Sequence, residues 1–142
     1  DLNGEDKTFD FDIKTASLPG ELHDMVDPVD YNAVVDNIDN ELKQAIQDWE
    51  NGKKYISRKR VLMAITKYYD GGGLKGALAK SFSEKRSQGL EDKLDSIRKI
   101  ISGIGAEAKS ATGDSLRKRA AFAVAQLRVN VKELEARLNP DP

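Results

Sequence analysis

The chain of 142 residues contains no cysteine and only one histidine, His23. The lack of cysteine excludes disulfide frameworks, a thiol nucleophile and cysteine-ligated zinc or iron–sulfur sites. A single histidine excludes a multi-histidine metal site, and no serine pattern near His23 indicates a catalytic triad. We therefore expect a protein that is not an enzyme and that has no catalytic residues, no bound metal and no cofactor.

Long hydrophobic runs are also missing. The longest apolar runs have only a few residues, whereas a helix needs about 20 to cross a bilayer, so no transmembrane segment is predicted. Hydrophobic residues make up 39% of the chain and charged residues 33%. With 142 residues, this composition is typical of one folded domain with a single core.

The alternation of apolar and polar residues that marks a β-strand is nearly absent. It is confined to Phe9, Phe11 and Ile13, within a segment that glycine and proline interrupt and that shows no helical periodicity. Because the rest of the chain offers no strand to pair with these residues, we interpret residues 1–27 as an extended N-terminal arm.

Most of the remaining chain shows the spacing of amphipathic helices. The first helix is predicted to have Asp27 as its N-cap and Pro28 at the first helical position, and to stop at Asn51–Gly52. A second helix is predicted over residues 54–69. It ends before the glycines at 71–73, because three successive glycines cost too much backbone entropy to continue a helix.

The last helix has the clearest pattern. It is predicted to start at Thr112–Ser115 and to end at Asn139–Pro140. Its apolar residues recur at steps of three and four, as in the seam of an antiparallel bundle; they are Leu116, Ala120, Ala123, Leu127, Val131, Leu134 and Leu138. Phe122 and Val129 lie seven residues apart on a second face, so we expect this helix to be buried on two sides.

Residues 74–104 are ambiguous, since they fit either one long helix or two helices with a break near Ser87–Gly89. In either case the helical segments predict an all-α fold. We expect a four-helix bundle with up-down-up-down topology over residues 28–142, preceded by the arm at 1–27.

Charge is distributed unevenly along the chain. The arm carries 8 acidic and 2 basic residues, net −6, whereas residues 53–86 carry 10 basic and 2 acidic residues, net +8. Within that segment five basic residues and no acidic residue lie close together: Lys53, Lys54, Arg58, Lys59 and Arg60. Either the acidic and basic segments neutralise each other across the fold, or the basic cluster faces an acidic partner.

A glycine-rich stretch at residues 71–77 is similar to a phosphate loop. A P-loop needs Gly-Lys-Ser/Thr after a strand, whereas this chain has Gly76-Ala77 after a helix. Lys75 and the free N–H groups at a helix start could still hold an anion there, but a flexible helix connection explains the glycines better.

The layout of an arm followed by four helices resembles the PsbQ-type extrinsic subunits of photosystem II. The features that carry this resemblance are Trp49 near a helix end, the basic stretch 53–60, the Tyr68–Tyr69 pair and the closing helix through residues 131–138. The resemblance implies a non-catalytic protein of the thylakoid lumen, peripheral to the membrane. Such a subunit docks on a larger complex with an acidic surface and supports oxygen evolution.

Docking of this kind would use the charged surface and the arm. The partner-binding residues that we expect are the five basic residues of the cluster together with Phe9 and Phe11 of the arm. The chain begins with Asp1 and no apolar leader, from which we expect a processed protein or an excerpt.

Two other functions fit the same features. A secreted or periplasmic helical adaptor or effector of a bacterium or pathogen would have the same composition. A nucleic-acid-binding bundle would use the basic cluster with its interleaved Tyr55, Tyr68, Tyr69 and Phe82, although the sequence pI of about 5.9 and the lack of a reader motif make nucleic acid the less favoured partner.

Overall fold

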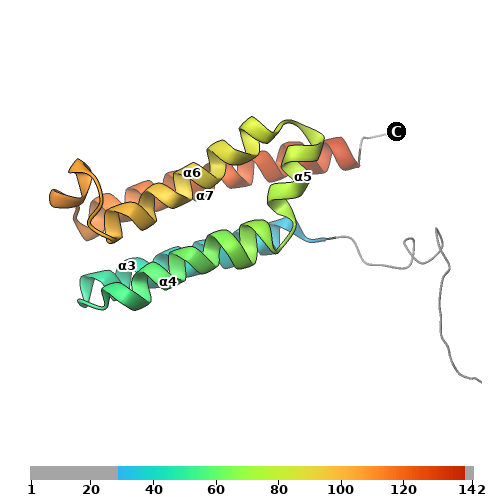
Figure 1. The fold of residues 1–142 in the computed structure, drawn as a ribbon. Helices are drawn as coiled ribbons and strands as arrows, with labels where there is room; N and C mark the ends of the chain where they lie inside the picture. The colour runs from blue at the N-terminus through green and yellow to red at the C-terminus, as the bar shows by residue number, and fades with distance from the viewer. Residues whose placement is uncertain (1–28, 140–142) are drawn as a thin grey trace, which may run out of the picture.

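The computed structural model describes residues 29–139, which are helical throughout apart from short connections (Figure 1). The elements are α3 (Tyr31–Glu50), α4 (Lys54–Met63), the π-helix η2 (Ala64–Asp70), α5 (Leu74–Ser81), α6 (Glu84–Ile101), the 3-10 helix η3 (Ala106–Lys109) and α7 (Gly113–Leu138). No strand occurs among these residues, so the all-α class is confirmed. The expected count of four helices is wrong, because this part of the chain forms five α-helices. The predicted arm lies outside the described residues.

The four long helices run side by side in two antiparallel pairs, α3 with α4 and α6 with α7 (Figure 1). The pairs contact each other through α3 against α7 and through α4 against α6. The fifth helix, α5, crosses one end of the molecule and connects the two pairs (Figure 1). The start of α3 and the end of α7 lie at that same end.

The start of α3 differs from the sequence prediction. The helix begins at Tyr31, and its N-cap is Asp30, whose carboxylate accepts a hydrogen bond from the Ala33 backbone N–H at 3.1 Å. Asp27 and Pro28 therefore do not start this helix. Both aspartates suit an N-cap in the sequence. Asp30 has the extended backbone that a cap requires, and Asp27 lies outside the described residues. The predicted stop is confirmed, since Asn51 is the C-cap and Gly52 adopts the left-handed region with φ +79°.

The second predicted helix is present but changes its geometry. It is α-helical to Met63 and π-helical over the last seven residues, 64–70. Tyr69, in the π-helix, is fully buried, and its hydroxyl donates a hydrogen bond to the Ser87 carbonyl oxygen at 2.7 Å. The glycines follow as predicted. A Cβ at Gly72 would lie 3.1 Å from a Val34 methyl group, so this glycine allows the connection to pass close to α3.

Residues 74–104 form two helices, α5 and α6, and the break lies at Phe82–Ser83 instead of Ser87–Gly89. The Ser83 hydroxyl accepts a hydrogen bond from the Arg86 backbone N–H at 3.0 Å and so caps α6. Gly89 lies inside α6 and is helical like its neighbours, so the chain does not turn there. The N-cap serine therefore decides where the chain turns.

The core gathers apolar side chains from all five α-helices. Leu127 is 1% exposed, so the predicted seam of α7 is confirmed over most of its length; Leu138 at its end is 52% exposed. The expectation of burial on two sides is wrong, because Phe122 is 58% and Val129 52% exposed. The reason is the arrangement of the pairs: α3, α5 and α6 contact α7, and none of them covers its outer face.

Candidate functional site

The basic cluster of the sequence lies at the start of α4. Lys53 is the N-cap residue, but no side chain caps this helix, and its first turn contains no acidic residue. Positive charge at a helix N-terminus opposes the helix dipole, at a cost of typically a few tenths to 1 kcal/mol for each charge. The cations at the start of α4 therefore lie where the helix dipole is unfavourable to positive charge.

Arg60 belongs to the same run of sequence but has a different environment. Its Nε donates to Asp48 Oδ2 at 2.8 Å and its Nη1 to Glu41 Oε1 at 3.2 Å. The hydrogen bond to Asp48 is the largest influence that raises the pKa of Arg60 above its ordinary value. Arg60 thus ties α4 to α3, and its charge is already neutralised within the molecule.

The other four cations have no such partners. Within residues 29–139, Lys53, Lys54, Arg58 and Lys59 make no ion pair. Residues three and four apart share a helix face, so Lys54, Arg58 and Lys59 surround Tyr55 and Leu62, which are 68% and 44% exposed. We call this surface the α4 basic face; it comprises Lys53, Lys54, Tyr55, Arg58, Lys59 and Leu62.

Arg58 and Tyr55 lie close to each other on this face. The Arg58 guanidinium carbon lies 6.0 Å from the centre of the Tyr55 ring, at the outer limit of a cation–π interaction. The face therefore combines an exposed ring and a leucine with positive charge around them. Phe9 and Phe11, the other predicted contact residues, lie outside the described residues.

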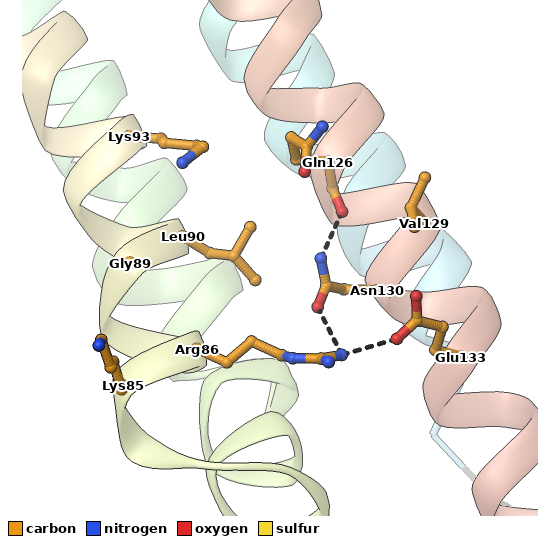
Figure 2. Close-up of a pocket in the computed structure, with 9 residues that line it drawn as sticks. All are labelled: Lys85, Arg86, Gly89, Leu90, Lys93, Gln126, Val129, Asn130 and Glu133. Carbon is orange, nitrogen blue, oxygen red and sulfur yellow. Dashed lines mark hydrogen bonds and ion pairs between the residues drawn. The ribbon is translucent and has the colours of Figure 1, made fainter.

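An open groove of about 470 Å³ lies between α6 and α7 (Figure 2). Its lining residues are Lys85, Arg86, Gly89, Leu90 and Lys93 from α6 and Gln126, Val129, Asn130 and Glu133 from α7. Arg86 crosses the groove and donates to Glu133 Oε1 at 2.7 Å and to Asn130 Oδ1 at 3.3 Å (Figure 2). Arg86 also lies over the Phe82 ring at 4.0 Å, and Arg137 lies over the same ring at 4.4 Å.

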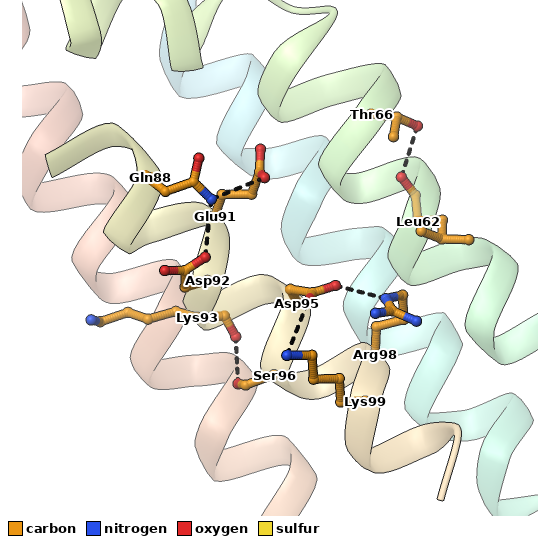
Figure 3. A network of polar contacts seen from close by, with 10 residues as sticks. All are labelled: Leu62, Thr66, Gln88, Glu91, Asp92, Lys93, Asp95, Ser96, Arg98 and Lys99. Atoms are coloured by element: carbon orange, nitrogen blue, oxygen red, sulfur yellow. Dashed lines mark hydrogen bonds and ion pairs between the residues drawn. The ribbon is translucent and has the colours of Figure 1, made fainter. Parts of the chain in front are cut away.

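Several basic side chains elsewhere form ion pairs within the molecule, whereas others, such as Lys85, Lys93, Lys118 and Lys132, make none within residues 29–139. Figure 3 shows the polar face of α6, where Asp95 pairs with Arg98 at 2.6 Å and with Lys99 at 3.7 Å. The hydrogen bond from Arg98 is the main cause of the lowered pKa of Asp95. Lys75 pairs with Glu91 at 2.7 Å, and this hydrogen bond raises the pKa of Lys75. Lys75 is therefore engaged with Glu91 and does not mark an anion site at the glycine-rich connection.

Among residues 29–139, no three histidine, cysteine, aspartate or glutamate side chains gather in a way that could hold a metal ion. None of the helices in this part of the chain is long and apolar enough to cross a membrane.

The sequence indicated the α4 cations and Tyr55 among them, but Leu62 was missed as part of the same surface. Its position four residues after Arg58 would have indicated a common face. The groove between α6 and α7 was missed altogether, because no sequence pattern shows which faces of two helices are left uncovered.

No protein-family model, curated protein or solved structure matches this chain.

Proposed function

We propose that this protein is a non-enzymatic accessory subunit that docks through the α4 basic face on an acidic surface of a larger assembly. One observation carries the proposal. Four cations at the start of α4 make no ion pair within residues 29–139, although Arg60, in the same run, makes two. Arg60 stabilises the fold, and so it is left out of the docking residues.

The chemistry of the face suits a protein partner. Exposed positive charge attracts an acidic surface and increases the rate of encounter, and this attraction is screened as salt rises. In protein interfaces a few central residues, often aromatic, supply most of the binding energy, and the residues around them exclude water. Tyr55, with 68% of its surface exposed, is the residue that would take this central place.

The resemblance to PsbQ-type subunits makes photosystem II the first assembly to test. On this proposal the arm precedes a bundle of four long helices, α3, α4, α6 and α7, and α5 is an additional helix that crosses one end. It would reside in the thylakoid lumen and stabilise the oxygen-evolving side of the complex. Secretion as a bacterial or pathogen adaptor, and binding of nucleic acid, are the alternatives that the experiment has to separate from this proposal.

The test measures co-sedimentation of the protein with photosystem II membranes from which the extrinsic subunits have been washed. The double variant Lys54→Glu, Lys59→Glu reverses charge on the α4 basic face. The matched control is Lys118→Glu, Lys132→Glu, which makes the same change in net charge on exposed residues of α7. We expect the α4 variant to bind at least about tenfold more weakly, equivalent to about 1.4 kcal/mol, and the control to bind within about twofold of the unmodified protein.

Binding of the unmodified protein should also fall between low and roughly molar salt. Binding that changes with neither salt nor the α4 variant would contradict the proposal. Electrophoretic shifts with DNA and RNA complete the test, and tighter binding to nucleic acid than to the membranes would favour the nucleic-acid alternative. Thermal unfolding of each variant shows that the fold is retained.

A further inference from the structure

We propose that the α6–α7 groove is the binding site for residues 9–13 of this same chain, Phe-Asp-Phe-Asp-Ile. The proposal is independent of the proposed function, because it concerns the isolated protein and a different surface. It joins the two features that the sequence and the fold leave unexplained: the alternating segment of the arm, and the uncovered apolar face of α7.

The two walls of the groove differ in chemistry. On the α6 side, Lys85 and Lys93 line the groove and make no ion pair within residues 29–139. Figure 2 shows Lys93 on the edge of α6 that faces α7 and Lys85 on the opposite edge. On the α7 side, Val129 is 52% exposed. Phe122, which is 58% exposed, lies seven residues before Val129 on the same side of α7, although it is not itself a lining residue of the groove.

The α6 side of the groove leaves space for a backbone at Gly89. Leu90 is 6% exposed and supplies the apolar part of this side. Gly89 has no side chain, and nothing lies within 4 Å of the position that a Cβ would occupy. An extended chain could therefore approach α6 closely at this point.

The segment 9–13 has matching chemistry. In an extended chain, successive side chains point to opposite sides. Phe9, Phe11 and Ile13 would then form one side, and Asp10 and Asp12 the other. The apolar side fits the α7 side with Val129 and the nearby Phe122, and the two carboxylates fit the α6 side with Lys85 and Lys93.

The charges that line the groove favour an acidic occupant. Lys85, Arg86 and Lys93 are positive, and Glu133 is the one negative lining residue, already paired with Arg86 at 2.7 Å. On the larger scale, the arm carries 8 acidic and 2 basic residues, and the remaining chain carries 16 acidic and 21 basic residues. The arm and the helical part therefore attract each other.

The chain can reach the groove. The first turn of α3 lies beside the last turns of α7, since Asn32 Nδ2 donates to Glu135 Oε2 at 2.9 Å, and Glu133 lines the groove two residues earlier. Residues 14–28 connect the segment to α3 and span up to roughly 50 Å when extended. This length exceeds the roughly 27 Å of an 18-residue helix such as α6.

The α4 basic face fits this segment less well. It lies on the outside of one helix and has no second wall, and it starts at the end of α3 opposite to the one at which the arm joins. The groove also gives Phe9 and Phe11 a site within their own chain, whereas the PsbQ-type resemblance places them on a partner.

The experiment uses the full-length protein with a nitroxide spin label at Thr8→Cys, which is unique because the chain has no cysteine. The amide signals of the ¹⁵N-labelled protein are compared with the label oxidised and reduced. We expect broadening at Gly89, Leu90, Val129 and Asn130 and none over Tyr55–Leu62. Broadening that centres on α4, or that spreads evenly over the molecule, overturns the proposal.

Matched variants test whether the lysines of the groove and the phenylalanines of the arm are needed for this contact. Lys85→Glu, Lys93→Glu in the groove, and separately Phe9→Ser, Phe11→Ser in the arm, should each abolish the broadening at the groove. Lys54→Glu, Lys59→Glu on α4 should preserve it, and the opposite pattern overturns the proposal. A mixture of ¹⁵N-labelled protein without the spin label and unlabelled protein with it should show no broadening. Broadening at the groove in that mixture identifies a second copy as the donor of the segment and also overturns the proposal.

Discussion

Tyr69 is the largest of the fully buried side chains, and its hydroxyl connects two helices that are distant in sequence. It donates to the Ser87 carbonyl at 2.7 Å, while the Ser87 hydroxyl donates to the Lys75 carbonyl at 2.8 Å. Burial is the largest influence on this phenol and raises the pKa of Tyr69 to about 12. These contacts hold η2, α5 and α6 together at the end of the molecule where α5 crosses.

The raised pKa predicts a loss of stability in alkali. Below pH 10 the phenol is neutral in both the folded and the unfolded chain. Between pH 10 and about 12 the unfolded chain loses this proton while the folded chain keeps it, so the free energy of unfolding falls by about 2–3 kcal/mol. We expect Tyr69→Phe to cost about 1 kcal/mol at pH 7, through the lost hydrogen bond, and to remove this part of the alkaline decline.

Urea unfolding at a series of pH values checks this prediction. The unmodified protein and Tyr69→Phe should differ in slope only above pH 10. Parallel curves between pH 9 and 12 would mean that the Tyr69 hydroxyl titrates as it does in water.

Leu127 and Val129 lie two residues apart on α7 but on different faces, with 1% and 52% of their surfaces exposed. We expect Leu127→Ala to reduce the free energy of unfolding by about 2–5 kcal/mol, because it leaves a cavity in the core. Val129→Ala should change it by less than about 0.5 kcal/mol, as for other surface substitutions. Denaturant unfolding measures both, and equal effects would show that both side chains are buried alike.

At the scale of the elements, side-chain caps mark the starts of α3, α6 and α7. Ser83 caps α6 and Thr112 caps α7, where Thr112 and Ser115 exchange hydrogen bonds in a capping box. Gly89, in contrast, adopts the helical conformation of its neighbours. A glycine in the sequence permits a break, but a serine with a partner three residues later stabilises one.

Two substitutions, one at the start of α6 and one in its interior, should therefore change the free energy of unfolding in opposite directions. Ser83→Ala removes the cap of α6 and should destabilise the protein by about 1 kcal/mol. Gly89→Ala should stabilise it by about 0.5–1 kcal/mol, because alanine favours a helix interior and its Cβ meets nothing within 4 Å. Thermal unfolding monitored by circular dichroism checks both. Destabilisation by Gly89→Ala would mean that the added methyl group meets a neighbour that packs against this position.

At the scale of the molecule, one hydrophobic core joins all the helices. The buried apolar side chains of the described residues run from Val34 in α3 to Leu134 in α7. Ion pairs such as Arg128–Asp36 at 2.9 Å and Arg60–Asp48 at 2.8 Å connect neighbouring helices at the surface. Exposed pairs of this kind contribute about 0–1 kcal/mol each, so the core supplies most of the stability.

Deletion of residues 1–27 should consequently have a small effect on folding. We expect the free energy of unfolding to change by less than about 1 kcal/mol, because the buried apolar side chains of residues 29–139 already form a core between Val34 and Leu134, to which we expect the arm to add only a surface contact. Urea unfolding of the full-length and shortened chains, both followed by far-UV circular dichroism, measures the difference. A much lower midpoint for the shortened chain would mean that the arm is part of the core.

The sequence by itself determined the helical class, the stop of the first helix at Asn51–Gly52 and the buried seam of α7 through Leu127. These features depend on residues close together in the chain, through apolar periodicity, capping and the backbone freedom of glycine. The basic cluster could also be recognised, because its charged residues lie close together in the sequence itself.

Only the tertiary structure decided which of these residues are available to a partner. Arg60 binds Glu41 and Asp48 on a neighbouring helix, while Lys54 and Lys59 are exposed and make no ion pair within residues 29–139. Phe122 and Val129 have the periodicity of a buried face, but no helix of the described residues covers them. Pairing and burial depend on how helices distant in sequence pack, and a local pattern of residues cannot specify which side of a helix its neighbours occupy.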